Sequence, residues 1–479
     1  MDTRWSNHMP AQRTLLLITA SSPAIRRVRR SRVLNFQQIT MPYLAAFVPP
    51  EWKVIHVDEE VSPIDITIAV DLVGITFHTP SAFHVYDLAA QFRKRGIPVA
   101  LGGPHVTLMA EEAQAHADVI FVGEAELQWP QFLRDFEIGR HMHRYCSTAV
   151  PALNAVPMAR KELYHRRDFT GGRLFATRGC PHGCDFCAVA VMYQRKVRTR
   201  PVAAVASEYA SFPGKVVIFW DDNLASDREY AKALFQSIAP YRKWWSSQVS
   251  IQAGKDAEFL EWAAKSGCKQ LFIGLESISQ QSMNGVRKGF NRVEEYVRVI
   301  EHIHEHGIAV QAGIVFGFDQ DTESIFIETL DFLESAGVQN ATFNILTPYP
   351  GTPLYQRLER GRRILTRDWS KYNGREDVVF QPRHMSPETL LEGYRYANQR
   401  FYSGTSLYRR LIRSPVGLWW TLPLNLAYAL ALRSARKDAA ADRGELMVRC
   451  ASRRSSLESV SAINARFTAQ NAFHERLNE

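Results

Sequence analysis

Cysteine is scarce in this chain, with six residues among 479. Three of the six, Cys146, Cys268 and Cys450, are isolated from one another and from the rest. This spacing gives no sign of the disulfide framework that is typical of small secreted domains. The N-terminus also shows no secretory signal, so we expect a reducing, cytoplasmic compartment.

Several patterns of common enzymes are missing as well. No G-x-G-x-x-G turn follows the first predicted strand, which argues against a dinucleotide as the ligand. We find no constellation of Ser, His and Asp, and no carboxylate pair of the kind that acid–base catalysis uses. Repeats and low-complexity tracts do not stand out. The chemistry of the chain must therefore depend on other residues.

The formal charge of +9 is unevenly distributed along the sequence. Residues 401–479 carry twelve Arg or Lys and six Asp or Glu, and a second basic run occupies residues 26–32. Basic patches can bind nucleic acid, but no nucleic-acid-binding motif accompanies these two. We therefore expect no nucleic acid as a partner, and we consider anionic lipid or an acidic substrate instead.

Residues 13–135 alternate short apolar runs with helical stretches, which indicates an α/β domain with a doubly wound, Rossmann-like parallel sheet. Its predicted strands are 14–18, 52–57, 72–77, 98–101 and 119–122. Ligands of such sheets bind at the carboxyl ends of the strands. Three of these ends carry small residues, namely Ser21-Ser22, Gly102-Gly103 and Gly123, which let a large flat ligand approach the backbone.

A second alternating series begins at Leu174 and predicts a partial (β/α)6 barrel, in which the chemistry belongs at the strand carboxyl ends. Its predicted strands are 174–177, 216–220, 249–253, 270–274, 309–317 and 341–346. Gly267 and Gly307 follow two predicted helices, at positions where a left-handed backbone conformation commonly ends a helix. The expected domains are 10–140 for the first α/β domain, 141–170 for a connector, 171–370 for the barrel and 371–479 for a mostly helical C-terminal region.

The C-terminal region contains an uncharged, mostly apolar run at residues 415–432, with arginines on both sides. A membrane-spanning helix needs about 20 apolar residues. This run is slightly shorter and contains Pro423 and Asn425. Three interpretations remain open: a buried helix pair, an interfacial membrane-binding segment and a true span.

The remaining cysteines, Cys180, Cys184 and Cys187, fall within eight residues after the first predicted barrel strand. Thiolates are soft ligands that suit iron–sulfur clusters and zinc. Three thiolates on one loop can hold three corners of a cubane and leave the fourth iron open. A zinc site would need a fourth ligand, such as His182, and an incidental group of buried thiols is a further alternative. The spacing favours the iron–sulfur cluster.

Together, these features resemble the cobalamin-dependent radical S-adenosylmethionine (SAM) enzymes. The motif C-x3-C-x2-C follows an α/β domain of the cobalamin-binding kind, and Phe186, which we expect beside the cofactors, precedes the last cysteine. The stretches 177–181 and 196–201 resemble the subgroup that holds the anaerobic porphyrin ring cyclase, hopanoid methylases and other C-methyltransferases. The resemblance covers roughly residues 13–380. The pairing of the two modules is its specific feature.

The resemblance implies three cofactors: a [4Fe–4S] cluster on the three cysteines, SAM and cobalamin. In such enzymes the cluster and SAM supply a 5′-deoxyadenosyl radical, which abstracts hydrogen from an unactivated carbon. An electron donor such as flavodoxin or ferredoxin is then an expected partner.

The resemblance also suggests residues that bind SAM. Asp221 and Asp222 take the place of the family's motif for the methionine ammonium, and helix capping by Asp222 or Asn223 is the alternative role. Glu276 resembles a carboxylate that contacts the ribose or the methionine, as opposed to a structural salt bridge. Gly313 resembles the glycine beside the adenine, as opposed to a position of tight strand packing.

The N-terminal domain lacks the Asp-x-His-x-x-Gly motif that places an imidazole below the cobalt. The resemblance therefore implies a cobalt without that lower ligand. We expect the corrin to contact residues at the strand ends, which are Ser21, Ser22, His78, Gly102, Gly103, His105, Gly123 and Glu124. For His78 and His105, an ordinary hydrogen-bonded loop histidine is the alternative. We expect His105 to contact the cofactor through its loop and not to ligate cobalt.

The resemblance favours methylation of an unactivated carbon in a hydrophobic small molecule, such as a lipid or tetrapyrrole. Radical cyclisation, oxidation or ring rearrangement without methyl transfer is the alternative. A regulatory sensor is disfavoured because the C-terminal half contains a nearly complete barrel, and a methylthiotransferase because only Cys146 lies upstream for further cluster ligation. The expected location is cytoplasmic, with the C-terminal region as a possible peripheral contact to the inner face of the membrane.

Overall fold

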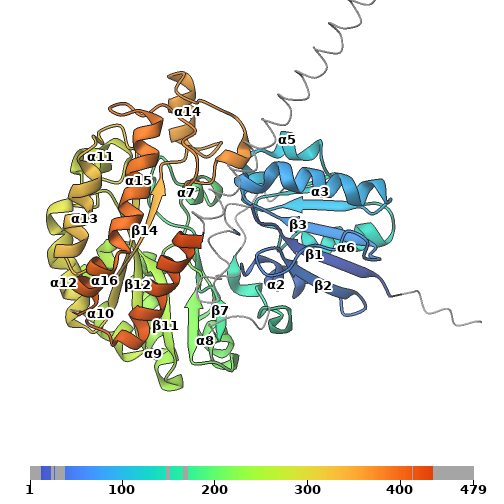
Figure 1. Cartoon of the computed structure of the whole chain (residues 1–479). Helices are drawn as coiled ribbons and strands as arrows, with labels where there is room; N and C mark the ends of the chain where they lie inside the picture. Colours follow the sequence, from blue (N-terminus) through green and yellow to red (C-terminus); the bar gives the residue numbers. More distant parts are fainter. Residues whose placement is uncertain are drawn as a thin grey trace, which may run out of the picture.

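The computed structural model describes residues 12–22, 26, 38–146, 152–164, 171–412 and 414–434. These residues form two parallel α/β modules and a helical C-terminal region (Figure 1). Most of the basic run 26–32, Arg413 and the basic tail beyond residue 434 lie outside the described residues.

The N-terminal sheet has six parallel strands in the order β2-β1-β3-β4-β5-β6. Its strands are β1 Thr14–Thr19, β2 Lys53–Asp58, β3 Leu72–Thr76, β4 Val99–Gly102, β5 Val119–Val122 and β6 Arg144–Cys146, and its helices are α2 Thr40–Ala45, α3 Ala82–Lys94, α4 Pro104–Leu108, α5 Ala110–Gln114 and α6 Trp129–Glu137. Along β1, Leu15 and Leu17 enter one core while Leu16 and Ile18 enter another. Both faces of the sheet are therefore buried, which confirms the predicted doubly wound architecture.

The second sheet is also parallel, with the order β14-β13-β12-β11-β10-β7, and confirms the predicted partial barrel. Its strands are β7 Gly172–Leu174, β10 Val216–Phe219, β11 Trp244–Val249, β12 Cys268–Glu276, β13 Ala309–Phe316 and β14 Asn340–Ile345. A separate antiparallel pair, β8 Thr177–Arg178 and β9 Arg198–Thr199, follows β7. The helices of this module are α7 Ala188–Met192, α8 Val202–Ser211, α9 Arg228–Ile238, α10 Ala257–Lys265, α11 Gln280–Gly285, α12 Tyr296–Glu305, α13 Ile325–Ser335 and α14 Pro353–Arg360.

Local signals in the sequence fix the ends of the barrel helices. Asp227 and Asp256 cap α9 and α10, and each side chain accepts a hydrogen bond of 3.0 Å from a backbone N–H in the first turn. Gly267 and Gly307 follow α10 and α12 with φ angles of 99° and 70°. The expected left-handed residues are therefore present at both positions.

Two barrel strands lie earlier than predicted: β7 ends at Leu174, where the predicted strand 174–177 begins, and the third strand shares only Val249 with its prediction. The third strand is β11, Trp244–Val249, and the predicted segment 249–253 falls mostly within a short 3-10 helix, Ile251–Lys255. The reason at β11 is that Ser246, Ser247 and Gln248 line a cavity. A polar surface that serves a ligand removes the apolar pattern by which a buried parallel strand is recognised.

The C-terminal region consists of α15 Pro387–Phe401, α16 Gly404–Leu411 and a helix at 418–434. The last helix passes over the barrel (Figure 1), where Trp420 Nε1 donates to Gln270 Oε1 of β12 at 3.0 Å. Asn425 Nδ2 donates to the carbonyl oxygen of Gln339 at 3.1 Å. One face of the run 415–432 is thus packed on the barrel. Within the described part of the chain, no helix has both the length and the hydropathy that crossing a membrane requires.

Candidate cofactor and substrate site

A cavity of about 600 Å³ separates the carboxyl ends of the two sheets. From the N-terminal sheet it is lined by Thr19, Ala20, Thr76, Gly102, Gly103, Gly123 and Glu124, and from the barrel by Asp221, Asp222, Ser246, Gln248, Phe272 and Gln311. The neighbouring ends of β1 and β3 form the switch point of the N-terminal sheet, where ligands of such sheets bind. The cavity therefore lies where both folds place their ligands.

The three cysteines lie on the loop between β8 and α7. Gly179 precedes them with φ 87°, and a Cβ there would clash with the carbonyl oxygen of Lys196, so the loop requires glycine. Cys187 is the N-cap residue of α7, and Cys180 Sγ accepts a hydrogen bond from Asn223 Nδ2 at 3.8 Å. The cysteines themselves do not line the cavity. Met192 and Tyr193, at the end of α7, do.

Burial favours the protonated form of two of these thiols, Cys184 and Cys187, in the absence of a metal. It raises the pKa of Cys184 to about 12, although the Lys288 ammonium acts in the opposite direction. Burial also raises the pKa of Cys187, against hydrogen bonds from the backbone of Ala190 and Val189. Burial makes the charged thiolate form unfavourable, and a bound cation that replaces the protons would stabilise it. Iron is such a cation.

The arrangement fits a cluster better than a single ion. Within the described residues, no three His, Cys, Asp or Glu side chains converge closely enough to hold one metal ion. His182, the candidate fourth ligand for zinc, instead stacks on Phe290 with ring centroids 3.8 Å apart. A cubane needs its thiolates at separate corners and needs no fourth protein ligand, so the donor set present here suits it.

Asp221 and Asp222 both line the cavity. Asp221 accepts hydrogen bonds from the backbone N–H of Ala176 and from the N–H and hydroxyl of Thr177. Asp222 accepts one from Gly179 N–H at 2.8 Å. Neither Asp222 nor Asn223 makes a side-chain cap to the 3-10 turn Leu224–Ser226 that follows. Their contacts instead tie the end of β10 to the cysteine loop, and the role of the aspartates toward the methionine ammonium stays a prediction.

Glu276 forms an ion pair of 2.6 Å with Lys288 and does not line the cavity. It follows a register shift in β12 and has a φ of 66°, which is unusual for a residue other than glycine. The Lys288 ammonium also lies 5.9 Å from the ring centre of Phe186. Lys288 thus connects Glu276 to the cysteine loop, and nothing in the sequence other than its charge pointed to this role.

Gly313, on β13, lies away from the cavity lining. A Cβ at this position would come within 2.9 Å of Phe272 Cζ, and Phe272 lines the cavity. Tight packing therefore accounts for the glycine, and its contact with adenine remains a prediction.

The expected cobalamin residues divide into two groups. His78, Gly102, Gly103, Gly123 and Glu124 line the cavity, while Ser21, Ser22 and His105 are buried outside its lining. At Gly103, where φ is 99°, a Cβ would lie 2.6 Å from Thr76 Oγ1. A flat macrocycle can approach a wall with so few side chains, so this face fits cobalamin.

His105 has a structural environment in the N-terminal core. Its side chain is fully buried, with Nδ1 3.2 Å from Thr79 Oγ1 and Nε2 3.1 Å from the hydroxyl of Tyr86. Burial lowers the pKa of His105, so the ring is neutral near pH 7. Both ring nitrogens have partners inside the domain, and a contact with the cofactor would have to come through the neighbouring backbone.

Sequence reasoning missed an ion cluster between the two modules. Glu124, at the end of β5, pairs with Arg178 at 2.6 Å and with Arg198 at 2.5 Å. Arg178 also pairs with Glu126 at 2.5 Å. Glu124, Glu126 and Arg178 all line the cavity, so the cluster forms part of its wall.

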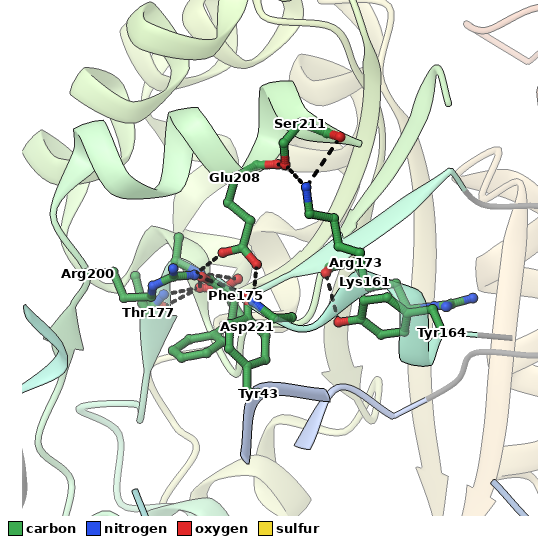
Figure 2. Close-up of polar contacts among 12 residues, drawn as sticks. Tyr43, Lys161, Tyr164, Arg173, Phe175, Thr177, Arg200, Glu208, Ser211 and Asp221 are labelled. Atoms are coloured by element: carbon green, nitrogen blue, oxygen red, sulfur yellow. Dashed lines mark hydrogen bonds and ion pairs between the residues drawn. The ribbon is translucent and has the colours of Figure 1, made fainter. Parts of the chain in front are cut away.

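A second polar contact joins the modules behind the cavity (Figure 2). Arg200 Nη1 donates to Glu208 Oε2 at 2.7 Å and to the hydroxyl of Tyr43, on α2, at 3.1 Å. The Arg200 and Glu208 side chains are 1% and 0% exposed. The ion pair lies within the barrel module, where removal of either partner would leave a buried charge, and the hydrogen bond to Tyr43 links it to the N-terminal module.

These features define an enzyme that works with bound cofactors: a three-thiol loop lies beside one wall of the cavity, and the opposite wall is glycine-rich. Residues 174–333 match the radical SAM superfamily, residues 26–133 match the B12 binding domain, and residues 352–416 match a domain of unknown function (DUF4070).

Two similar proteins are from Chlorobaculum tepidum. Bacteriochlorophyllide d C-12(1)-methyltransferase is 30% identical over 73% of this chain and 78% of its own. Bacteriochlorophyllide d C-8(2)-methyltransferase is 30% identical over 81% of this chain and 90% of its own. The methyltransferase TsrM from Kitasatospora setae, solved with cobalamin and a [4Fe–4S] cluster, has the same fold, with a TM-score of 0.64 and 15% identity over 90% of this chain and all of its own.

The chain belongs to the cobalamin-dependent radical SAM enzymes. Its cofactors are a [4Fe–4S] cluster, SAM and cobalamin. The resemblance and the cofactors predicted from the sequence are confirmed.

Proposed function

We propose that this enzyme methylates an unactivated carbon of a hydrophobic small molecule, and that the substrate is a tetrapyrrole or a polycyclic lipid. Bound cobalamin supplies the methyl group, and the cluster together with SAM supplies the radical that activates the carbon. The observation that carries the proposal is the single cavity onto which the carboxyl ends of both sheets open.

Similarity to known enzymes supports the substrate class. Two relatives at 30% identity are named as methyltransferases of bacteriochlorophyllide d. The hopanoid C-2 methylase of Rhodopseudomonas palustris, 25% identical over 75% of this chain, is named for a polycyclic lipid. Both substrate types are large and mostly apolar, so they share the chemistry that the cavity must accommodate.

The cavity wall supports an apolar substrate with a few polar anchors. Its apolar part includes Ile39, Met41, Leu44, Phe175, Met192 and Phe272. Gln248, Gln311 and Arg375 supply polar atoms at the same wall. An apolar pocket with few polar groups orients a ligand and keeps water away, which protects a reactive carbon radical.

The test is product analysis after anaerobic reconstitution with SAM labelled in its methyl group. Extracts of a strain without the gene would supply candidate substrates, because the unmodified precursor accumulates there. We expect a product heavier than its precursor by one labelled methyl group. A product with an unchanged carbon count would contradict methyl transfer and indicate radical cyclisation, oxidation or rearrangement.

We also propose that a small electron carrier such as flavodoxin or ferredoxin reduces the cluster. Turnover should then depend on adding a reduced carrier when chemical reductants are omitted.

A further inference from the structure

The helix at 418–434 has two faces with different environments. Its inner face belongs to the barrel: Thr421 and Asn425 are fully buried, and Tyr428 lines the cavity and lies 3.5 Å from Gln311 Nε2. Trp420 is hydrogen-bonded to Gln270. These contacts hold the helix in one orientation, so its outer face is also fixed.

The outer face is a stripe of large apolar side chains. The stripe consists of Leu418, Trp419, Leu422, Leu426 and Leu430, whose exposed fractions lie between 37% and 61%. Four of the five are leucines at intervals of four residues, so they follow one another along the same side of the helix. A contiguous exposed apolar surface of this kind usually marks an interaction site.

Charge indicates what the stripe contacts. Between Phe401 and Asp438 the sequence contains no Asp or Glu. It contains Arg410, which is fully buried, and five further cations: Arg409, Arg413, Arg433, Arg436 and Lys437. In the described part of the chain, Arg433 is exposed and follows the stripe at helical spacing. Arg409 is exposed on α16 and lies 3.6 Å from the largely buried Glu334. A leucine and tryptophan face with cations at its border and no acid in the same segment fits the interface of an anionic bilayer.

A protein partner fits less well. Specific protein interfaces have roughly one hydrogen bond per 100–200 Å². The stripe offers only the indole N–H of Trp419 and the guanidinium of Arg433 for that purpose. A lipid surface needs no directional bonds to the leucines.

We propose that the Leu418–Leu430 stripe docks on a lipid surface with anionic headgroups. The helix would then lie in the plane of the interface, and its inner face would place the cavity wall at Tyr428 next to the membrane. Docking on lipid does not depend on the proposed methyl-transfer reaction. Only its use, the delivery of an apolar substrate from the bilayer, rests on the proposed function.

The experiment is vesicle co-sedimentation of the full chain, without added cofactors, so that its outcome is independent of methyl transfer. One set of vesicles contains phosphatidylcholine alone, and the other also contains phosphatidylglycerol. The test variant is the double substitution Leu422→Glu with Leu426→Glu, at two exposed positions. The matched control is Leu365→Glu, since Leu365 is 51% exposed and lies outside the stripe.

We expect the unmodified chain to bind the anionic vesicles more tightly than the neutral ones. The double variant should bind about tenfold or more weakly, because each leucine loses apolar contact and brings a repelled charge. The control should bind like the unmodified chain. Circular dichroism and thermal melting should show that both variants remain folded.

Three results would overturn the proposal. The first is that the unmodified chain binds neither vesicle. The second is that the double variant binds as well as the control while truncation after residue 434 abolishes binding, since the basic tail would then hold the lipid. The third is that, without lipid, light scattering finds a dimer that the double variant converts to a monomer, since a second copy would then cover the stripe.

Discussion

Glu124 and Arg178 belong to different modules and form an ion pair of 2.6 Å at the wall of the shared cavity. Glu124 follows β5 of the domain that matches the B12 binding family, and Arg178 lies two residues before Cys180. One ion pair thus joins the end of the N-terminal sheet to the start of the three-cysteine loop.

The first prediction concerns this pair. Glu124→Ala would leave Arg198 without its 2.5 Å partner and Arg178 with Glu126 alone. Both guanidiniums are largely buried, so we expect the free energy of unfolding to fall by about 3 kcal/mol. Urea denaturation of the cofactor-free chain measures it. Glu111→Ala, which removes an exposed ion pair with Arg144, is the control and should have no measurable effect. Equal effects of the two variants would show that the cluster between the modules does not stabilise the fold.

The second prediction concerns the cluster ligands. Cys184→Ser should abolish the paramagnetic resonance signal of the reduced cluster and lower the iron content of the reconstituted chain, because a serine oxygen is a poor substitute for a soft thiolate. Cys146→Ser is the control, since Cys146 is exposed and far from the loop in sequence. A normal signal in the Cys184 variant would mean that this thiol is not a ligand.

The third prediction concerns the cobalamin wall. Gly103→Ala combines a left-handed backbone angle with a clash against Thr76 Oγ1. Relief of this clash must displace the cavity wall that Gly103, Thr76 and Phe77 form, so cobalamin should bind roughly tenfold more weakly or worse. Absorbance titration of the apo chain measures the affinity. Gly96→Ala is the control for the left-handed backbone angle alone. Gly96 has a φ of 76°, but no atom lies within 4 Å of the added Cβ, so this variant introduces no clash. Similar cobalamin affinities in the two variants would contradict a role for the Gly103 surface.

The fourth prediction concerns pH. Burial raises the pKa of Asp221 to about 7, although hydrogen bonds from Thr177 and Ala176 oppose this shift. In the unfolded chain an Asp titrates near pH 3.9. Between about pH 4 and pH 7 the folded state therefore binds more protons, so this group's contribution to stability is present at low pH and is lost as the pH rises through 7.

Asp221→Asn should flatten the dependence of unfolding free energy on pH between 5 and 8. Some slope should remain, because burial also raises the pKa of Asp321, to about 6. Urea unfolding of the apo chain at several pH values measures both slopes. An unchanged slope in the variant would show that Asp221 is already ionised in the folded chain at the low end of this range.

The sequence predicts the fold well because parallel strands with two buried faces leave strong apolar runs, as in β1 and β13. It fails at β11, where Ser246, Ser247 and Gln248 serve the cavity instead of a core. The cysteine loop is predictable because its three thiols lie within eight residues of one another in the sequence. The pairing of Glu124 with Arg178 is not, since 54 residues separate them and only the packing of two modules brings them together. Lys288 was missed for a different reason: it lies only 12 residues from Glu276, but no local pattern marks it as the partner of that carboxylate.

The location of Tyr428 has a practical consequence. The helix at 418–434 supplies one side chain to the chamber between the two sheets and five others to the exterior. Shortening the chain ahead of this helix would open the chamber and remove the outward leucines together, and lost turnover in such a product would not reveal which change mattered. Engineers who wish to alter substrate preference can instead vary the inward positions one at a time and keep the outward ones unchanged.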